Sequence, residues 1–365
     1  MRDLFHVPER YFLSHSVGCQ LKSAATALES AYLAPWQTEG GGAWDGWMAA
    51  LSAFQTGLAS LIGAQADLIC PQTNVSSALT KILYAMSDSL SGRTLLCTRE
   101  DFPSMGYVLQ QAERAGFQVK FVEGDPTQVA SWERCLDATI GLVFITHVFS
   151  NTSRMTPVAE ICAMARQVEA ISIVDIAQSA GIAAVDVTAW QVDFAIGTGV
   201  KFLCAGPGAC FLYVRAPLVE QAQPLDVGWF SHADPFEMDI QSFRFAESAM
   251  RFFGGTPSPA PLILANEAFR LWQQTGLESV QNQVTAYLSH LVAAVPTELR
   301  VSPSDPDKRG ATLVLDPPNR DHFAHLLQAQ GFKFDQRQAG FRFSVHAYTP
   351  QQDVEALADA LGQAL

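Results

Sequence analysis

The fold of this chain is decided between residues 174 and 215, which read VDIAQSAGIAAVDVTAWQVDFAIGTGVKFLCAGPGACFLYVR. One apolar run ends at Asp175, a second occupies Phe194–Gly197 and a third occupies Ala209–Val214. Short continuous apolar runs are typical of strands that are buried on both faces of a sheet. Asp175 closes the first run, and Lys201 follows the second in a glycine-rich, apolar context.

Further runs of the same kind precede this stretch and alternate with amphipathic segments. The full set is Ala66–Cys70, Arg93–Thr98, Gln118–Val122, Gly141–Thr146, Ile171–Asp175, Phe194–Gly197 and Ala209–Val214. Between them, Val75–Met86 and Val158–Val168 carry apolar residues at three- and four-residue spacing, which predicts helices. Strands that alternate with helices predict an α/β fold with a mainly parallel sheet, whose ligands bind outside the carboxyl ends of the strands.

The remainder of the chain predicts a second, smaller domain. Residues 254–261 (GGTPSPAP) have the composition of a linker. Beyond it we expect helices over Leu262–Thr275 and Ser279–Ala294, strands near Thr312–Leu315 and Gly340–Val345, and a closing helix over Gln351–Ala364. The predicted organisation is an N-terminal segment (1–50) that packs on the small domain, a large domain (51–255) and a small α+β domain (256–365).

Composition and charge exclude several classes of protein. The 365 residues are 48% hydrophobic and 16% charged, which argues against a mainly disordered chain. The formal charge of −13 disfavours binding to nucleic acid or to an anionic membrane surface. No apolar run of about 18 residues predicts a membrane span, and the opening MRDLFHVPERYFL does not resemble a secretion signal. The seven cysteines show no CxxC spacing, so we expect no disulfide framework, no metal site and a cytoplasmic enzyme.

Lys201 and Asp175 together indicate pyridoxal phosphate. Apolar surroundings lower the pKa of a lysine and make its neutral amine available to attack a carbonyl. A carboxylate at the end of a buried strand requires a charged or hydrogen-bonding partner, and pyridoxal phosphate needs such a group to keep its ring nitrogen protonated. The structural alternatives are a packed lysine whose amine reaches water and an aspartate that caps the following helix.

The sequence resembles the class V aminotransferase family, a fold-type I group of pyridoxal-phosphate enzymes that includes cysteine desulfurases and kynureninases. Residues 174–215 resemble the family core. Four further segments resemble the kynureninase branch: YFLSHSVG at 11–18, DFPSMGY at 101–107, GWFSH at 228–232 and GFRFSVHAYT at 340–349. The resemblance implies an enzyme with a large sheet domain and a smaller C-terminal domain, acting on an amino acid.

The resemblance also implies roles for individual residues. Lys201 would form the Schiff base, Asp175 would pair with the ring nitrogen, and Phe102 would stack on the ring. Gln178 would donate to the phenolic oxygen, and Arg342 would bind the α-carboxylate as a fork. The other residues implied near the cofactor are Ser104, Asn151, Thr152, Thr198 and Trp229, and those near the substrate are His232 and His15.

Phosphate binding is predicted where PQTNVSSALTKIL (71–83) begins a helix. The positive end of the helix dipole and its free N–H groups suit a dianion, and the resemblance names Thr73 and Asn74 as contacts. A cluster that only caps the helix is the alternative. In the family, a Thr in the position of Thr256 reaches the phosphate of the neighbouring subunit, which implies a homodimer with shared active sites.

Three positions depart from the kynureninase pattern. Val200 stands where Tyr is usual, Gln178 stands where His is usual, and the segment WQTEGGGAW (36–44) lacks the His associated with recognition of the aromatic substrate. Cysteine desulfurases carry a mobile Cys late in the chain, whereas this chain has none after Cys210. Three alternatives therefore remain open: hydrolytic Cβ–Cγ cleavage of a kynurenine-type amino acid with release of alanine, transamination of a small amino acid, and a catalytically idle cofactor-binding protein.

Overall fold

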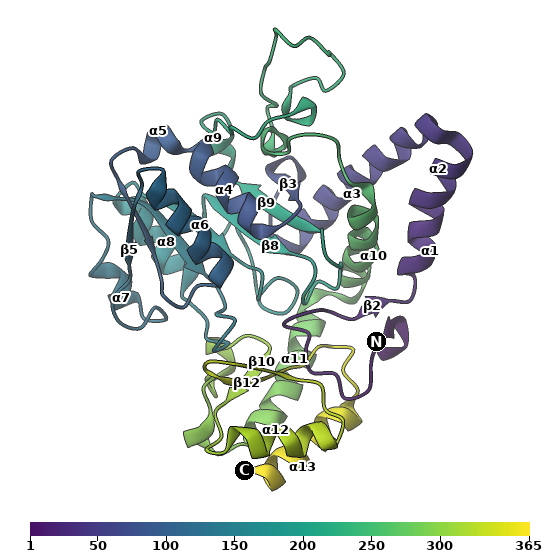
Figure 1. Cartoon of the computed structure of the whole chain (residues 1–365), viewed down its shortest axis with the longest axis vertical. Helices are drawn as coiled ribbons and strands as arrows, with labels where there is room; N and C mark the ends of the chain where they lie inside the picture. Colours follow the sequence, from purple (N-terminus) through teal and green to yellow (C-terminus); the bar gives the residue numbers. More distant parts are fainter.

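A seven-stranded sheet forms the centre of the molecule in the computed structural model, which describes all residues from 1 to 365 (Figure 1). Its strands lie in the order β3-β9-β8-β7-β6-β4-β5. Their bounds are Ile69–Gln72 (β3), Thr94–Cys97 (β4), Gln118–Phe121 (β5), Ile140–Thr146 (β6), Ile171–Asp175 (β7), Phe194–Thr198 (β8) and Cys210–Val214 (β9). Each strand falls on a predicted apolar run, and the α/β fold class is confirmed.

Strand β9 is the exception to the parallel pairing. β5, β4, β6, β7 and β8 pair in parallel, whereas β9 runs antiparallel to both β8 and β3. Parallel neighbours need a crossover connection, usually a helix. No helix lies between Thr198 and Cys210, so the chain turns back beside β8. The segment that makes this turn contains Lys201.

Helices connect the strands and surround the sheet. They are α4 (Val75–Ala85), α5 (Ser87–Leu90), α6 (Pro103–Arg114), α7 (Val129–Glu133), α8 (Val158–Gln167) and α9 (Ala216–Val219). Short 3₁₀ turns occupy Arg2–Leu4, Gly40–Ala43, Ala66–Leu68, Trp229–Ser231, Ala249–Phe252, Thr297–Leu299 and Pro306–Lys308. No helix combines the length and apolar character that crossing a bilayer requires.

Two long helices pack against each other beside the sheet. They are α3 (Trp44–Ile62) and α10 (Pro259–Thr275), and α1 (Ala24–Leu28), a π-helical turn (Glu29–Leu33) and α2 (Ala34–Glu39) stand next to them (Figure 1). Helix α3 ends at Gly63, whose φ of +69° is readily adopted only by glycine. Helix α1 and the π-helical turn contact α10, and α3 and α10 bury apolar residues such as Phe54 and Phe269 between them.

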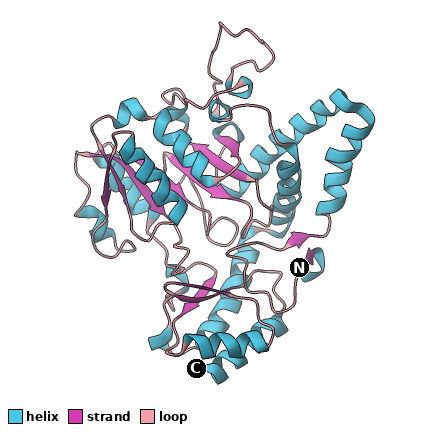
Figure 2. Cartoon of the chain, viewed as in Figure 1, coloured by secondary structure: helices cyan, strands magenta, loops and turns pink.

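The small C-terminal domain is built on a three-stranded antiparallel sheet in the order β10-β12-β11 (Figure 2). Its elements are β10 (Thr312–Leu315), β11 (Asp335–Arg337), β12 (Gly340–Ser344), α11 (Leu277–Ala293), α12 (Arg320–Ala329) and α13 (Gln351–Ala364). The short strand β11 was not predicted, since its residues are polar. The division of the chain into folding units at residues 50 and 255 stays a prediction.

The N-terminal segment joins the small sheet to the loop that carries Lys201. After the short pair β1 (Phe5–His6) and β2 (Gln20–Leu21), the Phe12 N–H donates to Lys333 O, and the Ser344 N–H donates to Phe12 O, both at 2.9 Å. At Gly18 the backbone N–H donates to Val200 O at 2.7 Å. A Cβ at this position would lie 2.0 Å from Lys201 O, so only glycine permits this approach.

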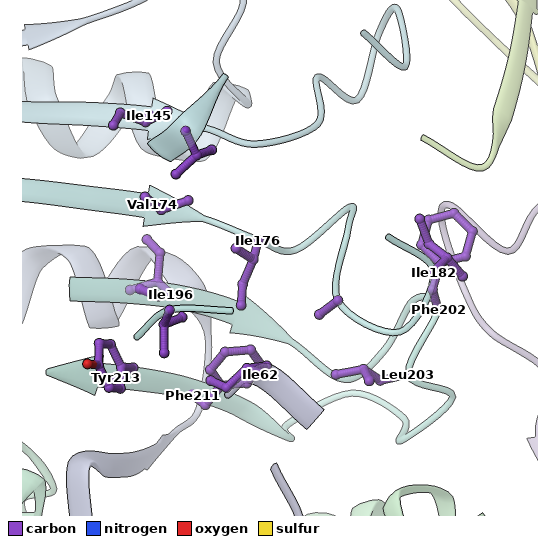
Figure 3. Close-up of a cluster of buried hydrophobic side chains, with 14 of the residues drawn as sticks. Ile62, Ile145, Val174, Ile176, Ile182, Ile196, Phe202, Leu203, Phe211 and Tyr213 are labelled. Carbon is purple, nitrogen blue, oxygen red and sulfur yellow. The ribbon is translucent and has the colours of Figure 1, made fainter. Parts of the chain in front are cut away.

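The hydrophobic core extends from the strands into the loop after β8. Figure 3 shows Ile145, Val174 and Ile196 on neighbouring strands, together with Phe202 and Leu203. Phe202 and Leu203 immediately follow Lys201 and are at most 1% exposed. The backbone of the lysine is therefore fixed by apolar burial, which roughly amounts to 1.5–3 kcal/mol for each large side chain.

Candidate functional site

Lys201 lies at the carboxyl end of β8, in a loop closed by backbone hydrogen bonds. The Gly199 N–H donates to Ala209 O at 2.7 Å, and the Ala205 N–H donates to Gly199 O at 2.8 Å. The lysine amine makes no hydrogen bond within the protein and lies 5.3 Å from the centroid of the Phe102 ring. The structure thus brings together the predicted anchor and the predicted stacking residue.

Asp175 is the last residue of β7, the strand that neighbours β8. One carboxylate oxygen accepts the Ala177 N–H at 2.8 Å, and the other has no hydrogen-bond partner in the protein. Burial raises the pKa of Asp175, and the positive charge of Lys201 opposes this. Burial likewise lowers the pKa of Lys201, and Asp175 opposes that shift. The result is an available carboxylate oxygen and a lysine that readily gives up its proton.

Phe102 is positioned by the aspartate that precedes it. It forms the N-cap of α6, and the carboxylate of Asp101 accepts the Thr98 N–H at 2.8 Å and the Thr146 hydroxyl at 2.7 Å. Since Thr146 pairs with Asp175 across β6 and β7, Asp101 links the stacking segment to the strand that ends in Asp175. Burial raises the pKa of Asp101 to about 7. This role was not predicted from the sequence, although Asp101 directly precedes Phe102 in the DFPSMGY motif.

A polar pocket of about 260 Å³ lies at the N-terminus of α4. Its lining includes Gln72, Thr73, Ser77, Gly255, Thr256 and Ser258. Asn74 caps the helix, because its side-chain oxygen accepts the Ser77 N–H at 2.8 Å. The N–H groups of Val75 and Ser76 have no partner within the helix, as is usual for a first turn. Thr73 is therefore a pocket residue, whereas the side-chain oxygen of Asn74 serves the cap.

The motifs GWFSH and GGT are joined at the edge of this pocket. The Phe230 N–H donates to Gly254 O at 3.1 Å, and the Gly254 N–H donates to the Ser231 hydroxyl at 2.9 Å. The Trp229 indole N–H donates to the Thr256 hydroxyl at 3.3 Å. Thr256 and Thr73 of one chain thus line the same pocket, and the prediction that Thr256 reaches a neighbouring subunit stays a prediction.

Lys81, for which no role was predicted, holds the segment that leads into GGT (254–256). Its amine donates to the carbonyls of Phe252 and Phe253, both at 2.8 Å, and lies 3.3 Å from Asp226. Lys81 on α4 therefore fixes one wall of the pocket. In the sequence, only its position about two turns after the predicted start of this helix indicates that Lys81 lies near the phosphate pocket.

Arg342 lies on the face of the small sheet that meets the large domain. Its Nη1 donates to Ser150 O at 2.7 Å, which ties β12 to the turn after β6. Its Nε donates to one oxygen of Asp335 at 2.7 Å, and its Nη2 donates to the other. Arg342 is 2% exposed, and two of its five N–H groups remain without a partner. Arg342, which was expected to bind the substrate α-carboxylate, is therefore already bound to a carboxylate of the protein.

His15 lies behind Asp335. Its Nε2 donates to Asp335 at 3.1 Å, and its Nδ1 lies 2.8 Å from the Ser344 hydroxyl. His15 is 2% exposed, and burial lowers its pKa, so the ring is neutral at physiological pH. Both ring nitrogens are thus occupied, and the geometry fits a residue that orients Asp335 rather than the expected contact with substrate.

The remaining predicted residues surround this centre. Gln178 donates to His15 O at 3.1 Å, and Thr198 ends β8, where its hydroxyl accepts the Val200 N–H at 3.4 Å. Ser104 lies in the first turn of α6, and Asn151 and Thr152 follow the Ser150 carbonyl that binds Arg342.

His232 differs from the other predicted residues, because both of its ring nitrogens contact main-chain atoms of its own loop. Its Nδ1 lies 2.6 Å from Asp234 O and 3.0 Å from Asp234 N, and its Nε2 lies 3.0 Å from Ser242 O. These bonds stabilise the loop that follows GWFSH. The structure therefore provides no open nitrogen on His232 for a substrate.

Residues 45–357 match the family described as "Aminotransferase class-V". A kynureninase of Deinococcus radiodurans is 30% identical over 327 residues, which cover 87% of this chain and 78% of that protein. A kynureninase of Burkholderia mallei is 28% identical over 361 residues, which cover 93% of this chain and 85% of the relative. The chain belongs to the class V aminotransferase family. The resemblance to its kynureninase branch is confirmed.

Solved structures of pyridoxal-phosphate enzymes and cysteine desulfurases share the fold of this chain. The apo cysteine desulfurase from Thermococcus onnurineus NA1 superposes with a TM-score of 0.85 at 20% identity, covering 97% of this chain and 94% of that one. A mutant of the cystine C–S lyase C-DES, with glycine covalently linked to its pyridoxal phosphate, gives a TM-score of 0.87 at 22% identity over 99% of both chains. At these identities the comparison supports the fold-type I architecture alone.

His346 connects the small domain of this class V chain to the lysine loop. Its Nε2 donates to Phe202 O at 2.8 Å, its Nδ1 accepts the Ala347 N–H, and its ring stacks on Tyr348. Together with the bond from Arg342 to Ser150, this contact fixes β12 against the large domain. His346 is fully buried, and burial lowers its pKa to about 4.

Replacing His346 with glutamine should weaken the pH dependence of the unfolding free energy. The folded pKa of about 4 lies below the unfolded value near 6.5. The stabilising contribution is therefore complete above pH 6.5 and is lost as the pH falls towards 4, by up to about 3 kcal/mol. Urea unfolding at several pH values measures the difference in unfolding free energy between wild type and variant.

This comparison with the variant is needed because the raised pKa of Asp101 has the opposite effect on the unfolding free energy over the same pH range. The exposed His322, replaced by glutamine, is the control, and parallel curves for wild type and the His346 variant would contradict the expectation.

Proposed function

We propose that this chain is a kynureninase-type enzyme, which hydrolyses the Cβ–Cγ bond of an aryl-ketone amino acid and releases alanine. The observation that carries the proposal is that Lys201, Asp175 and Phe102 come together in a chain that aligns over most of its length with kynureninases. Membership of the class V family indicates a pyridoxal-phosphate-dependent enzyme that acts on an amino acid.

The residues present fit pyridoxal phosphate. The unpartnered oxygen of Asp175 suits a protonated ring nitrogen, and Phe102 offers an aromatic face. Thr73, Thr256 and the free N–H groups of α4 suit the phosphate. When bound, the cofactor supplies an electron sink for the pair of electrons left at the substrate Cα after deprotonation.

The protein residues bind the substrate and move its protons. Arg342 orients the α-carboxylate with its two remaining N–H groups, and Lys201 accepts the Cα proton and returns it. Burial lowers the pKa of the lysine, which favours the neutral amine that this transfer requires. Gln178 follows the end of β7 and Thr198 ends β8, so both contribute buried polar groups on this side of the sheet.

An aromatic cluster supports an aromatic substrate. The Trp229 ring makes edge-on contacts with Trp44, Phe230 and Phe236, with centroid distances of 5.9, 4.6 and 5.6 Å. Trp44 in turn contacts Trp47. Aromatic side chains in this arrangement favour flat rings through edge and face contacts. We propose that this cluster, in place of a histidine in residues 36–44, contacts the aromatic ring of the substrate.

The cysteines disfavour persulfide chemistry, although desulfurases share the fold. All seven cysteines are buried, and Cys204 and Cys210 are the ones nearest to Lys201 in sequence. Burial raises the pKa of both thiols, which keeps them protonated. A thiol that attacks sulfur must be accessible and ionised, and this site provides none.

We infer a homodimer from the loop that follows Leu225. This loop projects from the body of the large domain (Figure 1). It exposes several apolar side chains, including Phe236 at 64% and Ile240 at 97%. Such a patch is typical of a protein interface. Family precedent favours a second copy of this chain as the partner, with Thr256 near the shared site.

The seven unpaired cysteines favour a reducing compartment, so we place the enzyme in the cytoplasm.

Incubating the holoenzyme with L-kynurenine, without a keto acid, tests this proposal. We expect many equivalents of alanine and of the aromatic acid, because hydrolysis regenerates the cofactor in each cycle. Transamination would instead stop after one equivalent until a keto acid is supplied. If kynurenine and 3-hydroxykynurenine release no alanine, while a small amino acid converts the cofactor to its amine form, the chain is a transaminase. If no amino acid changes the cofactor spectrum, the chain is an idle binder.

A further inference from the structure

The hairpin formed by β11 and β12 presents two chemically different faces. On one face, Phe341 and Phe343 pack against Phe323 of α12. On the other, Arg342 lies opposite Asp335 and reaches Ser150 of the large domain. Residues two apart on a strand share a face, so Arg337 lies on the same face as Asp335.

The Arg342–Asp335 pair has no net charge. Asp335 accepts from two nitrogens of Arg342 and from His15, and these groups hold the pKa of Asp335 well below its usual range against the effect of burial. Asp335 is therefore ionised, while the buried His15 is neutral. An α-carboxylate that approaches Arg342 is attracted by one charge and repelled by the other.

Arg337 is the unpaired cation next to this pair. It is exposed and makes no ion pair or hydrogen bond within the protein, unlike Arg342. Its charge also reaches the catalytic centre: burial lowers the pKa of Lys201, and the positive charges of Arg342 and Arg337 add to that effect.

We propose that Arg337 is a substrate-specificity residue, which supplies the net positive charge that attracts the α-carboxylate, while Arg342 fixes its orientation. This inference rests on the proposed amino-acid substrate. With Arg337 the carboxylate-binding end carries a charge of +1, and without it the charge is zero. The site therefore selects amino acids with a free carboxylate over their esters and amides.

Binding of L-alanine to the holoenzyme, followed by the shift of the cofactor absorption band, tests this role. Arg337→Gln should weaken alanine binding about tenfold, which corresponds to about 1.4 kcal/mol, because the variant removes the net positive charge at the carboxylate-binding end. It should also raise KM for the cleaved substrate with little change in kcat, as expected when uniform binding is lost. Arg337→Lys should retain most of the affinity. Arg270→Gln, on the distant helix α10, is the matched control and should bind as wild type does.

Charge compensation separates electrostatics from a structural role. Adding Asp335→Asn to Arg337→Gln restores a charge of +1, so alanine affinity should recover towards that of wild type. The affinity of wild type should also fall with ionic strength more steeply than that of Arg337→Gln. Wild-type affinity in Arg337→Gln, equal losses in the Gln and Lys variants, or identical salt dependence would each overturn the proposal. Because alanine binding does not require Cβ–Cγ cleavage, this result is independent of whether kynurenine is cleaved.

Discussion

Replacing Lys201 with alanine should reduce turnover by at least about 10³-fold, the upper part of the range for losing a general acid–base group. Lys201 is the only lysine at the carboxyl ends of the central strands, and its amine has no partner in the protein. The variant should fold, because Phe202 and Leu203 continue to anchor the loop in the core. Activity and circular dichroism measured on the same sample check both expectations.

The exposed Lys308 provides a control for the lysine substitution. Its side chain is 74% exposed beside Asp305, and Lys308→Ala should have wild-type activity. Turnover of the Lys201 variant within tenfold of wild type would mean that another group moves the Cα proton.

Replacing Asp175 with asparagine should reduce turnover by about 10³-fold while the fold and cofactor binding persist. The carboxylate charge pairs with the ring nitrogen and keeps it protonated. If its loss lowers the pKa of that nitrogen by about 3 units, the cost is about 4 kcal/mol. Asparagine preserves the hydrogen bond from the Ala177 N–H, so the turn after β7 remains intact.

A second aspartate distinguishes charge from capping. Asp186 accepts the Ala189 N–H at 2.8 Å in an exposed turn, and Asp186→Asn should leave turnover unchanged. Steady-state kinetics and the pH dependence of the cofactor absorption band provide the measurements. If the Asp175 variant shows near-normal turnover and an unaltered band, the carboxylate serves only to cap the turn.

The large sheet could be predicted from the sequence because its strands are buried on both faces. Continuous apolar runs such as Ile171–Val174 are typical of buried strands. The direction of β9 could not be predicted in the same way, since it depends on the loop around Lys201 and not on the strand residues. The polar strand β11 carries no apolar pattern, so it was missed.

The cofactor residues could also be predicted, because they follow strand ends within recognisable motifs. Asp175 and Lys201 lie together because neighbouring parallel strands bring their carboxyl ends to the same side of the sheet. The carboxylate-binding end depends instead on how the small domain packs against the large one. Arg342 was found, whereas Asp335 and Arg337 were not, since pairing across a short hairpin leaves little signal in sequence.

His15 illustrates the limit of motif reasoning. Its position in YFLSHSVG suggested contact with the substrate, but the chain there runs beside β12. The ring consequently meets Ser344 and Asp335. Tertiary packing, which no local pattern describes, determines that contact.

Reduction of the holoenzyme with borohydride, followed by peptide mapping, tests the assembled site most directly. Borohydride fixes the cofactor on the amine that holds it, and the chain has six lysines among which to choose. We predict one modified peptide per chain, which contains Lys201. Stoichiometric modification of any other lysine, or no modification of a cofactor-loaded chain, would contradict the site described above.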